Sequence, residues 1–343
     1  MRIFKCFIVT FLVIFLQGNN LWAFEEYTKE KFSTSQKNNE RILLHFHAEW
    51  CPTCKSQAKA LDSLELEGKL KGIKIYRVDF DKEDEFKSSL KVSDQSTFVA
   101  FYGGPETGRI IGITSKDDIN QFITQKLRKI SLSEQLDLMQ KQNRSKLPED
   151  KRKIMDASLE KLKASKIEEK APKLGQVIQN FQLTDTKGKR QTLDSLLKKG
   201  PVVVSFFRGS WCPYCNAQLK NYQEYHSQFK AKNATLVAIT PETTKSLNDK
   251  NFGDEFDFII LQDTKNQYSK KLGLVFGLDE SIKKLYKEFG IDLEKDQNSS
   301  EWELPLPATF VVGKNRKILY SFVSADYTKR ANPEEILLAI PKK

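Results

Sequence analysis

Two segments of the sequence run from an apolar stretch into the same motif: Ile42-Leu43-Leu44-His45-Phe46-His47-Ala48-Glu49-Trp50-Cys51-Pro52-Thr53-Cys54 and Val202-Val203-Val204-Ser205-Phe206-Phe207-Arg208-Gly209-Ser210-Trp211-Cys212-Pro213-Tyr214-Cys215. Each apolar stretch has the length and composition of a buried strand, and an amphipathic helical pattern follows each motif. The helices are expected at 51–66 and 212–229. A strand that leads into Trp-Cys-Pro-x-Cys and a helix therefore occurs twice, which indicates a duplicated α/β architecture.

Strand and helix patterns continue around both motifs. In the first half, strands are expected at 73–80, 97–102 and 109–113, and Gly103-Gly104 turns the last two into a hairpin before a helix that ends near 128. In the second half, strands are expected at 235–239, 257–261, 309–312 and 318–322, and Pro333 opens the last helix. The prediction is an α/β protein with two domains, each a central mixed β-sheet flanked by helices.

A Lys- and Glu-rich stretch from 131 to 170 lies between the two halves. Its apolar residues Met155, Leu159 and Leu162 fall at helical spacing, so one face can pack while the charged face is solvated. We expect a helical connector packed on the second domain. The predicted organisation is then 1–23, 24–130, 131–170 and 171–343, in which the first segment is a signal peptide and the third is the connector.

The first 23 residues have the pattern of a secretory signal. A basic start is followed by an apolar run from Cys6 to Leu16, a polar stretch and Ala23 as the expected cleavage position. The alternative is an uncleaved membrane anchor, but the run is shorter than the roughly 20 residues that span a bilayer. We therefore expect an exported, for example periplasmic, protein. The net charge of +11 comes from interspersed lysines and acids, so no nucleic-acid partner is expected.

Removing Cys6 with the signal leaves four cysteines, all of them in the two Cys-x-x-Cys pairs. A scaffold of structural disulfides is thereby excluded, and the remaining choices are working thiols or metal ligands. A Cys₄ zinc site is the alternative, but 157 positions separate Cys54 from Cys212, whereas the pairs of a zinc ribbon are about 15 to 20 residues apart. We expect no metal and no cofactor.

The position of each pair at a helix start explains why it should be reactive. Free N–H groups and the positive end of the helix dipole favour a thiolate, which lowers a thiol pKa that is normally about 8.5. Cys51 and Cys212 are therefore the predicted nucleophiles. Cys54 and Cys215 lie one turn deeper and are the predicted resolving thiols, so that Cys51-Cys54 and Cys212-Cys215 form redox-active disulfides.

The segment Ala48-Glu49-Trp50-Cys51-Pro52-Thr53-Cys54-Lys55 after a strand resembles the thioredoxin active site, and the resemblance covers about 25–130. It implies a supporting role for Trp50. Six residues before the nucleophile, where thioredoxins carry a buried Asp, stands His45, either as a neutral base or as a hydrogen-bonded core histidine. Ser96-Thr97 stands where thioredoxins have a cis-Pro and a Thr, so substrate binding is expected to be atypical.

The second half, about 131–343, resembles the peroxiredoxin-like branch of the alkyl hydroperoxide reductase and thiol-specific antioxidant family. The resemblance rests on 206–216 around Trp211, on 302–310 and on Asp326-Tyr327-Thr328. It places Pro307 in a cis-Pro loop beside Thr309, with an ordinary trans Pro as the alternative. Peroxiredoxins carry Thr or Ser three residues before, and Pro seven residues before, the peroxidatic cysteine, where this chain has Gly209 and Ser205. Arg208 either assists Cys212 or makes an ordinary surface salt bridge.

We therefore expect an exported thiol-disulfide oxidoreductase with antioxidant activity, in which Cys212 attacks a peroxide or a disulfide and Cys215 closes an internal disulfide. Cys51 is then the expected reductant of that disulfide, and a membrane transporter of thiol reductant is the expected electron source. The alternatives are a thiol oxidase or isomerase for exported proteins and, from another class, a redox-inert binding scaffold. The reduction potentials of the two pairs would separate the expected reductant from the oxidase or isomerase, and the motifs do not determine these potentials.

Overall fold

The computed structural model describes residues 24–342, and the predicted signal at 1–23 lies outside the described residues. The first domain has a five-stranded sheet in the order β1-β3-β2-β4-β5, with β4 and β5 forming the expected antiparallel hairpin. The strands are β1 (Glu25–Glu26), β2 (Arg41–His47), β3 (Ile73–Asp79), β4 (Thr97–Tyr102) and β5 (Glu106–Ile111). The helices are α1 (Lys29–Lys37), α2 (Pro52–Leu66), α3 (Asp84–Leu90) and α4 (Lys116–Lys126).

Strand β2 shows why this sheet is the centre of the domain. Its residues are buried on both faces, as expected for a central strand that reads as a continuous apolar run. Leu43 packs with α2 and α4 on one face, while Ile42, Leu44 and Phe46 pack with α1 and α3 on the other. Because β2 is the buried central strand, the first Cys-x-x-Cys pair, which follows its carboxyl end, is held in a fixed position on the sheet.

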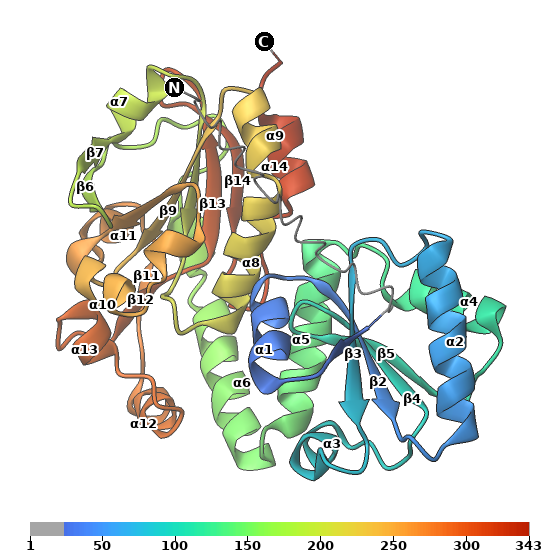
Figure 1. Ribbon diagram of the computed structural model, residues 1–343. Helices are drawn as coiled ribbons and strands as arrows, with labels where there is room; N and C mark the ends of the chain where they lie inside the picture. Colours follow the sequence, from blue (N-terminus) through green and yellow to red (C-terminus); the bar gives the residue numbers. More distant parts are fainter. Residues whose placement is uncertain (1–23, 343) are drawn as a thin grey trace, which may run out of the picture.

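The second domain has a seven-stranded sheet in the order β14-β13-β8-β9-β10-β6-β7 and a separate two-stranded sheet. The strands are β6 (Gln182–Asp185), β7 (Arg190–Thr192), β8 (Val202–Phe206), β9 (Thr235–Thr240), β10 (Ile259–Gln262), β11 (Val275–Gly277), β12 (Glu303–Pro305), β13 (Ala308–Val312) and β14 (Ile318–Val323). The helices are α7 (Leu193–Leu197), α8 (Pro213–Glu224), α9 (His226–Ala231), α10 (Thr244–Asp249), α11 (Gln267–Lys271), α12 (Glu280–Glu288), α13 (Leu293–Gln297) and α14 (Pro333–Ala339). The expected fold, two mixed sheets flanked by helices, is confirmed (Figure 1).

The helix expected at 212–229 is broken into α8 and α9 at Tyr225. The carbonyl of Asn221 accepts from the Tyr225 amide, and the chain then starts a new helix at His226. Both helices keep their apolar sides on the same core, with Leu219, Tyr222 and Phe229 fully buried. The break leaves the position of the second Cys-x-x-Cys pair at the start of α8 unchanged.

The stretch between the domains forms two helices, α5 (Leu132–Lys146) and α6 (Glu149–Ala164), followed by the 3₁₀ turn η1 (Ile167–Lys170). Pro148, which cannot continue a helix interior, stands at the start of α6 and separates the two. Leu132 and Leu136 of α5 belong to the core of the second domain, and α6 packs against α12. Both helices therefore lie against the second domain, between its sheet and the first domain (Figure 1).

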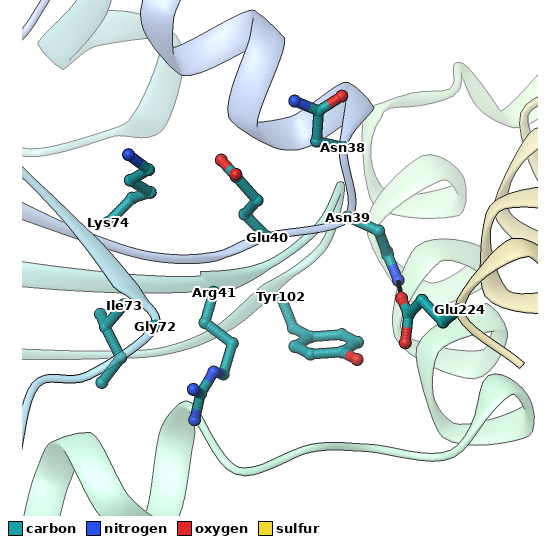
Figure 2. Close-up of a pocket in the computed structure, with 9 residues that line it drawn as sticks. All are labelled: Asn38, Asn39, Glu40, Arg41, Gly72, Ile73, Lys74, Tyr102 and Glu224. Atoms are coloured by element: carbon teal, nitrogen blue, oxygen red, sulfur yellow. Dashed lines mark hydrogen bonds between the residues drawn. The ribbon is translucent and has the colours of Figure 1, made fainter. Parts of the chain in front are cut away.

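Helix α5 also links the two domains through a chain of polar contacts. Gln135 Nε2 donates to Asn39 Oδ1 at 2.6 Å, and Asn39 Nδ2 donates to Glu224 Oε1 of α8 at 2.5 Å. A surface cavity of about 420 Å³ opens beside this contact, and Figure 2 shows Tyr102 and the Asn39–Glu224 pair along it. None of the four described cysteines lines this cavity. Within residues 24–342 no helix combines the length and the apolar composition needed to cross a membrane.

Candidate active sites

The first pair lies at the start of α2, directly after β2. Cys51 is the N-cap residue and Pro52 follows as the first helical residue, where the missing N–H costs no hydrogen bond. The Cys51 Sγ accepts a hydrogen bond from the Cys54 backbone N–H at 3.2 Å. Cys51 is 3% exposed, and the neighbouring Trp50 is 61% exposed with its indole N–H donating to Asp81. The sulfur that a partner meets first is therefore that of Cys51, beside an exposed tryptophan.

Cys54 is fully buried one turn deeper, where its Sγ lies 3.9 Å from the Phe46 carbonyl. Burial and the hydrogen bond with Cys51 raise the pKa of Cys54 to about 11. Cys54 is therefore protonated at neutral pH in the reduced protein, and a resolving role for it requires a change in its surroundings after Cys51 has reacted.

His45 lies beneath this pair and is fully buried on β2. Its Nε2 is 2.9 Å from Gln57 Oε1, and the Gln57 amide donates to the carbonyls of Ser96 and Ile113. Burial and the nearby His47 lower the pKa of His45 to about 3, so its ring is neutral. Of the two alternatives, the hydrogen-bonded core histidine describes this contact, while the role as base remains a prediction.

Ser96 directly precedes β4, of which Thr97 is the first residue, and the Ser96 backbone approaches the first pair. Ser96 adopts a positive φ of 58°, and its carbonyl accepts from Gln57 and from the Gly112 N–H. The hydroxyls of Ser96 and Thr97 donate to the carbonyls of Gln95 and Asp94. The peptide bonds here are trans, so this loop reaches its shape through a left-handed residue in place of a cis-Pro.

The second pair lies at the start of α8 in a more enclosed setting. Cys212 is the N-cap residue, is 1% exposed and accepts no capping hydrogen bond, and Cys215 is fully buried. Arg330 donates from Nη2 to the Cys215 Sγ at 3.1 Å. The Arg330 guanidinium is itself 4% exposed and is held by the carbonyls of Tyr327 and Lys329. A buried cation thus contacts the deeper sulfur of the pair.

This arrangement reverses the predicted charge distribution within the second pair. Burial alone raises the pKa of a thiol, but at Cys215 the hydrogen bond from Cys212 and the charges of Arg330 and Arg208 outweigh it and lower the pKa to about 5. Burial, together with the hydrogen bond and charge of Cys215, raises the pKa of Cys212. The prediction that the helix start holds the thiolate on Cys212 is therefore wrong for the resting reduced pair, because the arginine contact lies at Cys215.

Arg208 is the second buried cation of the site, and the surface salt bridge considered for it is wrong. The residue is 4% exposed, and its guanidinium donates to the Tyr286 hydroxyl and lies over the rings of Trp211 and Tyr327 at 5.0 and 5.1 Å. Aromatic faces hold a desolvated guanidinium favourably. The Nε atoms of Arg208 and Arg330 are buried donors with no hydrogen-bond partner among the described residues. These cations can therefore stabilise negative charge at the pair.

The loop before Cys212 explains why a glycine stands where peroxiredoxins have a hydroxyl residue. Gly209 has a φ of 152°, and a Cβ there would lie 2.3 Å from Trp211 Nε1. The next residue, Ser210, donates from both its backbone N–H and its hydroxyl to the buried carboxylate of Glu242. Trp211 therefore occupies the space that a side chain at 209 would need, and Glu242 fixes the loop.

The proline expected to be cis is trans, since the described residues contain no cis peptide bond. Pro307 directly precedes β13, and its carbonyl accepts from the Ser324 N–H at 3.1 Å. Thr309 lies opposite Ser205 in the sheet, with their hydroxyls 3.2 Å apart, and both contact the amide of Gln218. Thr309 therefore supports α8 from below through a buried polar cluster, in which Tyr222 also takes part.

Sequence reasoning missed three residues that shape these sites. Gln57 and Gln218 both stand six positions after the first cysteine of their pair, and both reach from the helix to the sheet beneath. The shared pattern Trp-Cys-Pro-x-Cys-x-x-Gln was a signal that could have found them. Arg330 had no such signal, because it is one of 56 basic residues and lies 115 positions from the sulfur it contacts.

A cavity of about 200 Å³ opens over Cys212. Its walls include the aromatic residues Trp211, Tyr214, Tyr286, Phe289 and Tyr327. The connector closes the remaining side with Asn143, Arg144, Leu147, Arg152 and Met155 from α5, α6 and the turn between them. Cys212 lines this cavity while Cys215 does not, so a small molecule reaches the pair at Cys212.

The structure does not bring the two pairs together. Helix α2 lies at the edge of the first domain remote from α8, and α5 and α6 lie between the two domains (Figure 1). The Cys₄ zinc site considered from the sequence is therefore not formed. Direct attack of Cys51 on the second pair is also outside this arrangement, so the predicted relay needs a movement of the domains or a second molecule.

Comparison with known proteins matches both halves. A family model described as Thioredoxin matches residues 23–125, and one described as AhpC/TSA family matches residues 174–321. Thioredoxin of Chlamydia caviae is 33% identical over 84 residues, which are 24% of this chain and 80% of that protein. The thiol-disulfide oxidoreductase ResA of Bacillus anthracis is 25% identical over 150 residues, 44% of this chain and 69% of ResA.

Two further similarities fall on the second half. The 1-Cys peroxiredoxin PER1 of Triticum aestivum is 23% identical over 174 residues, 49% of this chain and 71% of that protein. The crystal structure of peroxidoxin BcpB from Mycobacterium tuberculosis covers 49% of this chain and 96% of its own, at 22% identity and a TM-score of 0.38. With a thioredoxin domain followed by an AhpC/TSA domain, the chain belongs to the thioredoxin family and is a thiol oxidoreductase.

Proposed function

We propose that the protein is an exported thiol peroxidase whose second pair reduces small hydroperoxides. The proposal rests on the different environments of the two cysteines at the start of α8. Cys212 alone lines the cavity, while Cys215 is held as an anion by the 3.1 Å contact with Arg330. A cavity of about 200 Å³ admits a small molecule, and the burial of both sulfurs keeps them away from the surface of a large partner.

In this mechanism Cys212 attacks the terminal peroxide oxygen as its proton passes to the Cys215 thiolate. The O–O bond breaks, Cys212 becomes a sulfenic acid, and the alkoxide takes the proton from Cys215 and leaves as an alcohol. The restored Cys215 thiolate then attacks the sulfenic sulfur, which forms the Cys212–Cys215 disulfide and releases hydroxide that is protonated to water. Arg208, which lines the cavity, offers an Nε–H without a partner among the described residues as a donor for the developing oxyanion.

Small disulfides are a second substrate class for the same pair, because the absence of a hydroxyl residue at Gly209 removes one peroxide contact typical of peroxiredoxins. Attack by Cys212 would then give a mixed disulfide and a free thiol, and Cys215 would displace the second thiol. The reaction also ends at the Cys212–Cys215 disulfide. The two substrate classes differ only in whether a sulfenic acid is formed on the way.

The test is to expose the reduced protein to hydrogen peroxide, to an organic hydroperoxide or to oxidised glutathione and to identify oxidised cysteines by mass spectrometry. We expect peroxides to oxidise the second pair and the Cys215→Ser variant to react more slowly and to retain a sulfenic acid on Cys212 that dimedone traps. Cys54→Ser is the matched control and should leave this step unchanged. If peroxides spare Cys212 while oxidised glutathione converts it, the peroxidase assignment is refuted and disulfide exchange replaces it.

We further propose that the first pair re-reduces the second and that a membrane transporter of thiol reductant supplies the first. The proposal rests on the presence of two pairs in one chain and on the signal-like residues 1–23. In Cys54→Ser protein, Cys51 should accumulate in a mixed disulfide with Cys212 or Cys215. Formation that is independent of dilution indicates domain movement within one molecule, and formation that falls with dilution indicates transfer between molecules. Normal re-reduction without Cys51 and Cys54 would exclude the relay.

A further inference from the structure

Three buried side chains that can bind a metal ion meet beneath the first pair. His45 and His47 lie two residues apart on β2 and therefore point to the same face of the sheet. Cys54 reaches the same place from the first turn of α2. One nitrogen from each imidazole and the Cys54 Sγ all lie within 4.8 Å of one another, and all three residues are buried.

The hydrogen bonds of Gln57 determine which nitrogen of His45 is available. Gln57 uses its amide N–H groups as donors to two backbone carbonyls, so its Oε1 faces His45 Nε2 as an acceptor. His45 Nε2 must then carry the proton, and Nδ1 keeps a free lone pair. A neutral imidazole whose second nitrogen donates to an oxygen is the usual arrangement of a metal-binding histidine.

His47 has a similar arrangement of its two nitrogens. Its Nε2 lies 3.6 Å from the carboxylate of Glu49, while its Nδ1 is buried. The Nδ1 atoms of both histidines have no hydrogen-bond partner within residues 24–342. A buried polar atom without a partner is destabilising, so two such atoms next to a thiol require an explanation.

We propose that His45 Nδ1, His47 Nδ1 and the Cys54 thiolate form a binding site for a d¹⁰ metal cation, copper(I) or zinc(II), in the reduced first domain. Two imidazoles and one thiolate are a donor set that both cations accept. This set differs from the four-cysteine zinc site considered from the sequence, because it uses one cysteine and two histidines of the same domain. The expectation of no metal, made from cysteine spacing alone, is replaced by this proposal.

The site is sensitive to the redox state of the pair. A Cys51–Cys54 disulfide removes the thiolate on which the cation depends, so the oxidised domain should not bind it. A bound cation should in turn protect Cys54 from alkylation and disulfide formation. Metal binding and thiol exchange at the first pair are therefore mutually exclusive.

The test uses the full chain with Cys212→Ser and Cys215→Ser, so that the only thiols of the described residues are those of the first pair. The reduced protein is titrated without oxygen with zinc(II) or copper(I) against a chelator of known affinity, and stoichiometry is read by native mass spectrometry. We expect one cation per chain and a thiolate-to-metal absorption band. The cation that binds more tightly is identified as the ligand of the site. If neither cation binds, the proposal is overturned.

Variants identify the ligands. His47→Leu should abolish stoichiometric binding, whereas His226→Leu, which alters the third histidine of the chain at a site in the second domain, should leave it unchanged. Gln57→Leu removes the partner of His45 and should weaken binding about 10- to 100-fold. The oxidised parent protein tests the proposal without any substitution that affects folding. Unchanged affinity in His47→Leu, or equal binding by the oxidised protein, would overturn it.

Discussion

Replacing Arg330 by methionine tests the electrostatics of the second pair. The side chain keeps most of its length and loses the guanidinium that contacts the Cys215 Sγ at 3.1 Å. A hydrogen bond to a charged group contributes about 1.5–3 kcal/mol, and one pKa unit corresponds to about 1.4 kcal/mol. The pKa of the pair should therefore rise by about 1–2 units in the variant. Since the pKa of Cys215 is lowered to about 5 in the parent, the change falls within the accessible pH range.

The assay follows thiolate absorbance and the rate of peroxide reduction against pH, in a Cys51→Ser/Cys54→Ser background that removes the other pair. In the parent, Cys215 is anionic above about pH 5, so the rate should hold at neutral pH and fall as the pH drops through this value. In Arg330→Met the fall should begin at higher pH. Lys329→Met removes the same charge from the exposed neighbouring residue and is the matched control. Equal profiles for the two variants, or no shift in either, would refute the role assigned to Arg330.

Two further substitutions probe the support of the same pair. Gln218→Leu leaves the buried hydroxyl of Thr309 with fewer partners, so urea denaturation should show a loss of about 1–3 kcal/mol in the free energy of unfolding; an unchanged midpoint would argue against the polar cluster. Gly209→Ala places a Cβ against Trp211 and requires a strained backbone, so we expect about 1–3 kcal/mol of destabilisation and altered tryptophan fluorescence. Gly277→Ala, with open space around its Cα, is the control, and an equal effect there would contradict the steric argument.

The local features of the fold were predictable because they depend on short-range patterns. The apolar run 202–207 predicted β8, and the prolines after Cys51 and Cys212 predicted where α2 and α8 begin. The connector was predicted as helical from its spacing, but its division by Pro148 and the wall it forms over Cys212 were not. That wall depends on contacts between residues more than 50 positions apart, which no local periodicity encodes.

The predictions for the site were wrong where a residue's conformation or contacts depend on the segments that pack around the motif. The resemblance to the peroxiredoxin-like branch made Pro307 a cis-Pro candidate, but the peptide bond before β13 is trans. An ordinary surface salt bridge was one of the two alternatives for Arg208, yet three aromatic rings surround its guanidinium. Both errors have the same physical origin, because burial changes the cost of a charge or a backbone geometry and becomes known only when distant segments have packed.

The two pairs show that one local motif can shift the pKa of its deeper cysteine in opposite directions. At α2 a backbone N–H donates to the leading sulfur, and burial together with the hydrogen bond to Cys51 raises the pKa of the deeper thiol. At α8 a buried arginine reaches the deeper sulfur and lowers its pKa instead. The helix start is common to both, so its dipole cannot account for the difference. The guanidinium of Arg330, which lies after β14 in the chain, therefore explains why the deeper cysteine of the second pair is available as a base while that of the first pair is not.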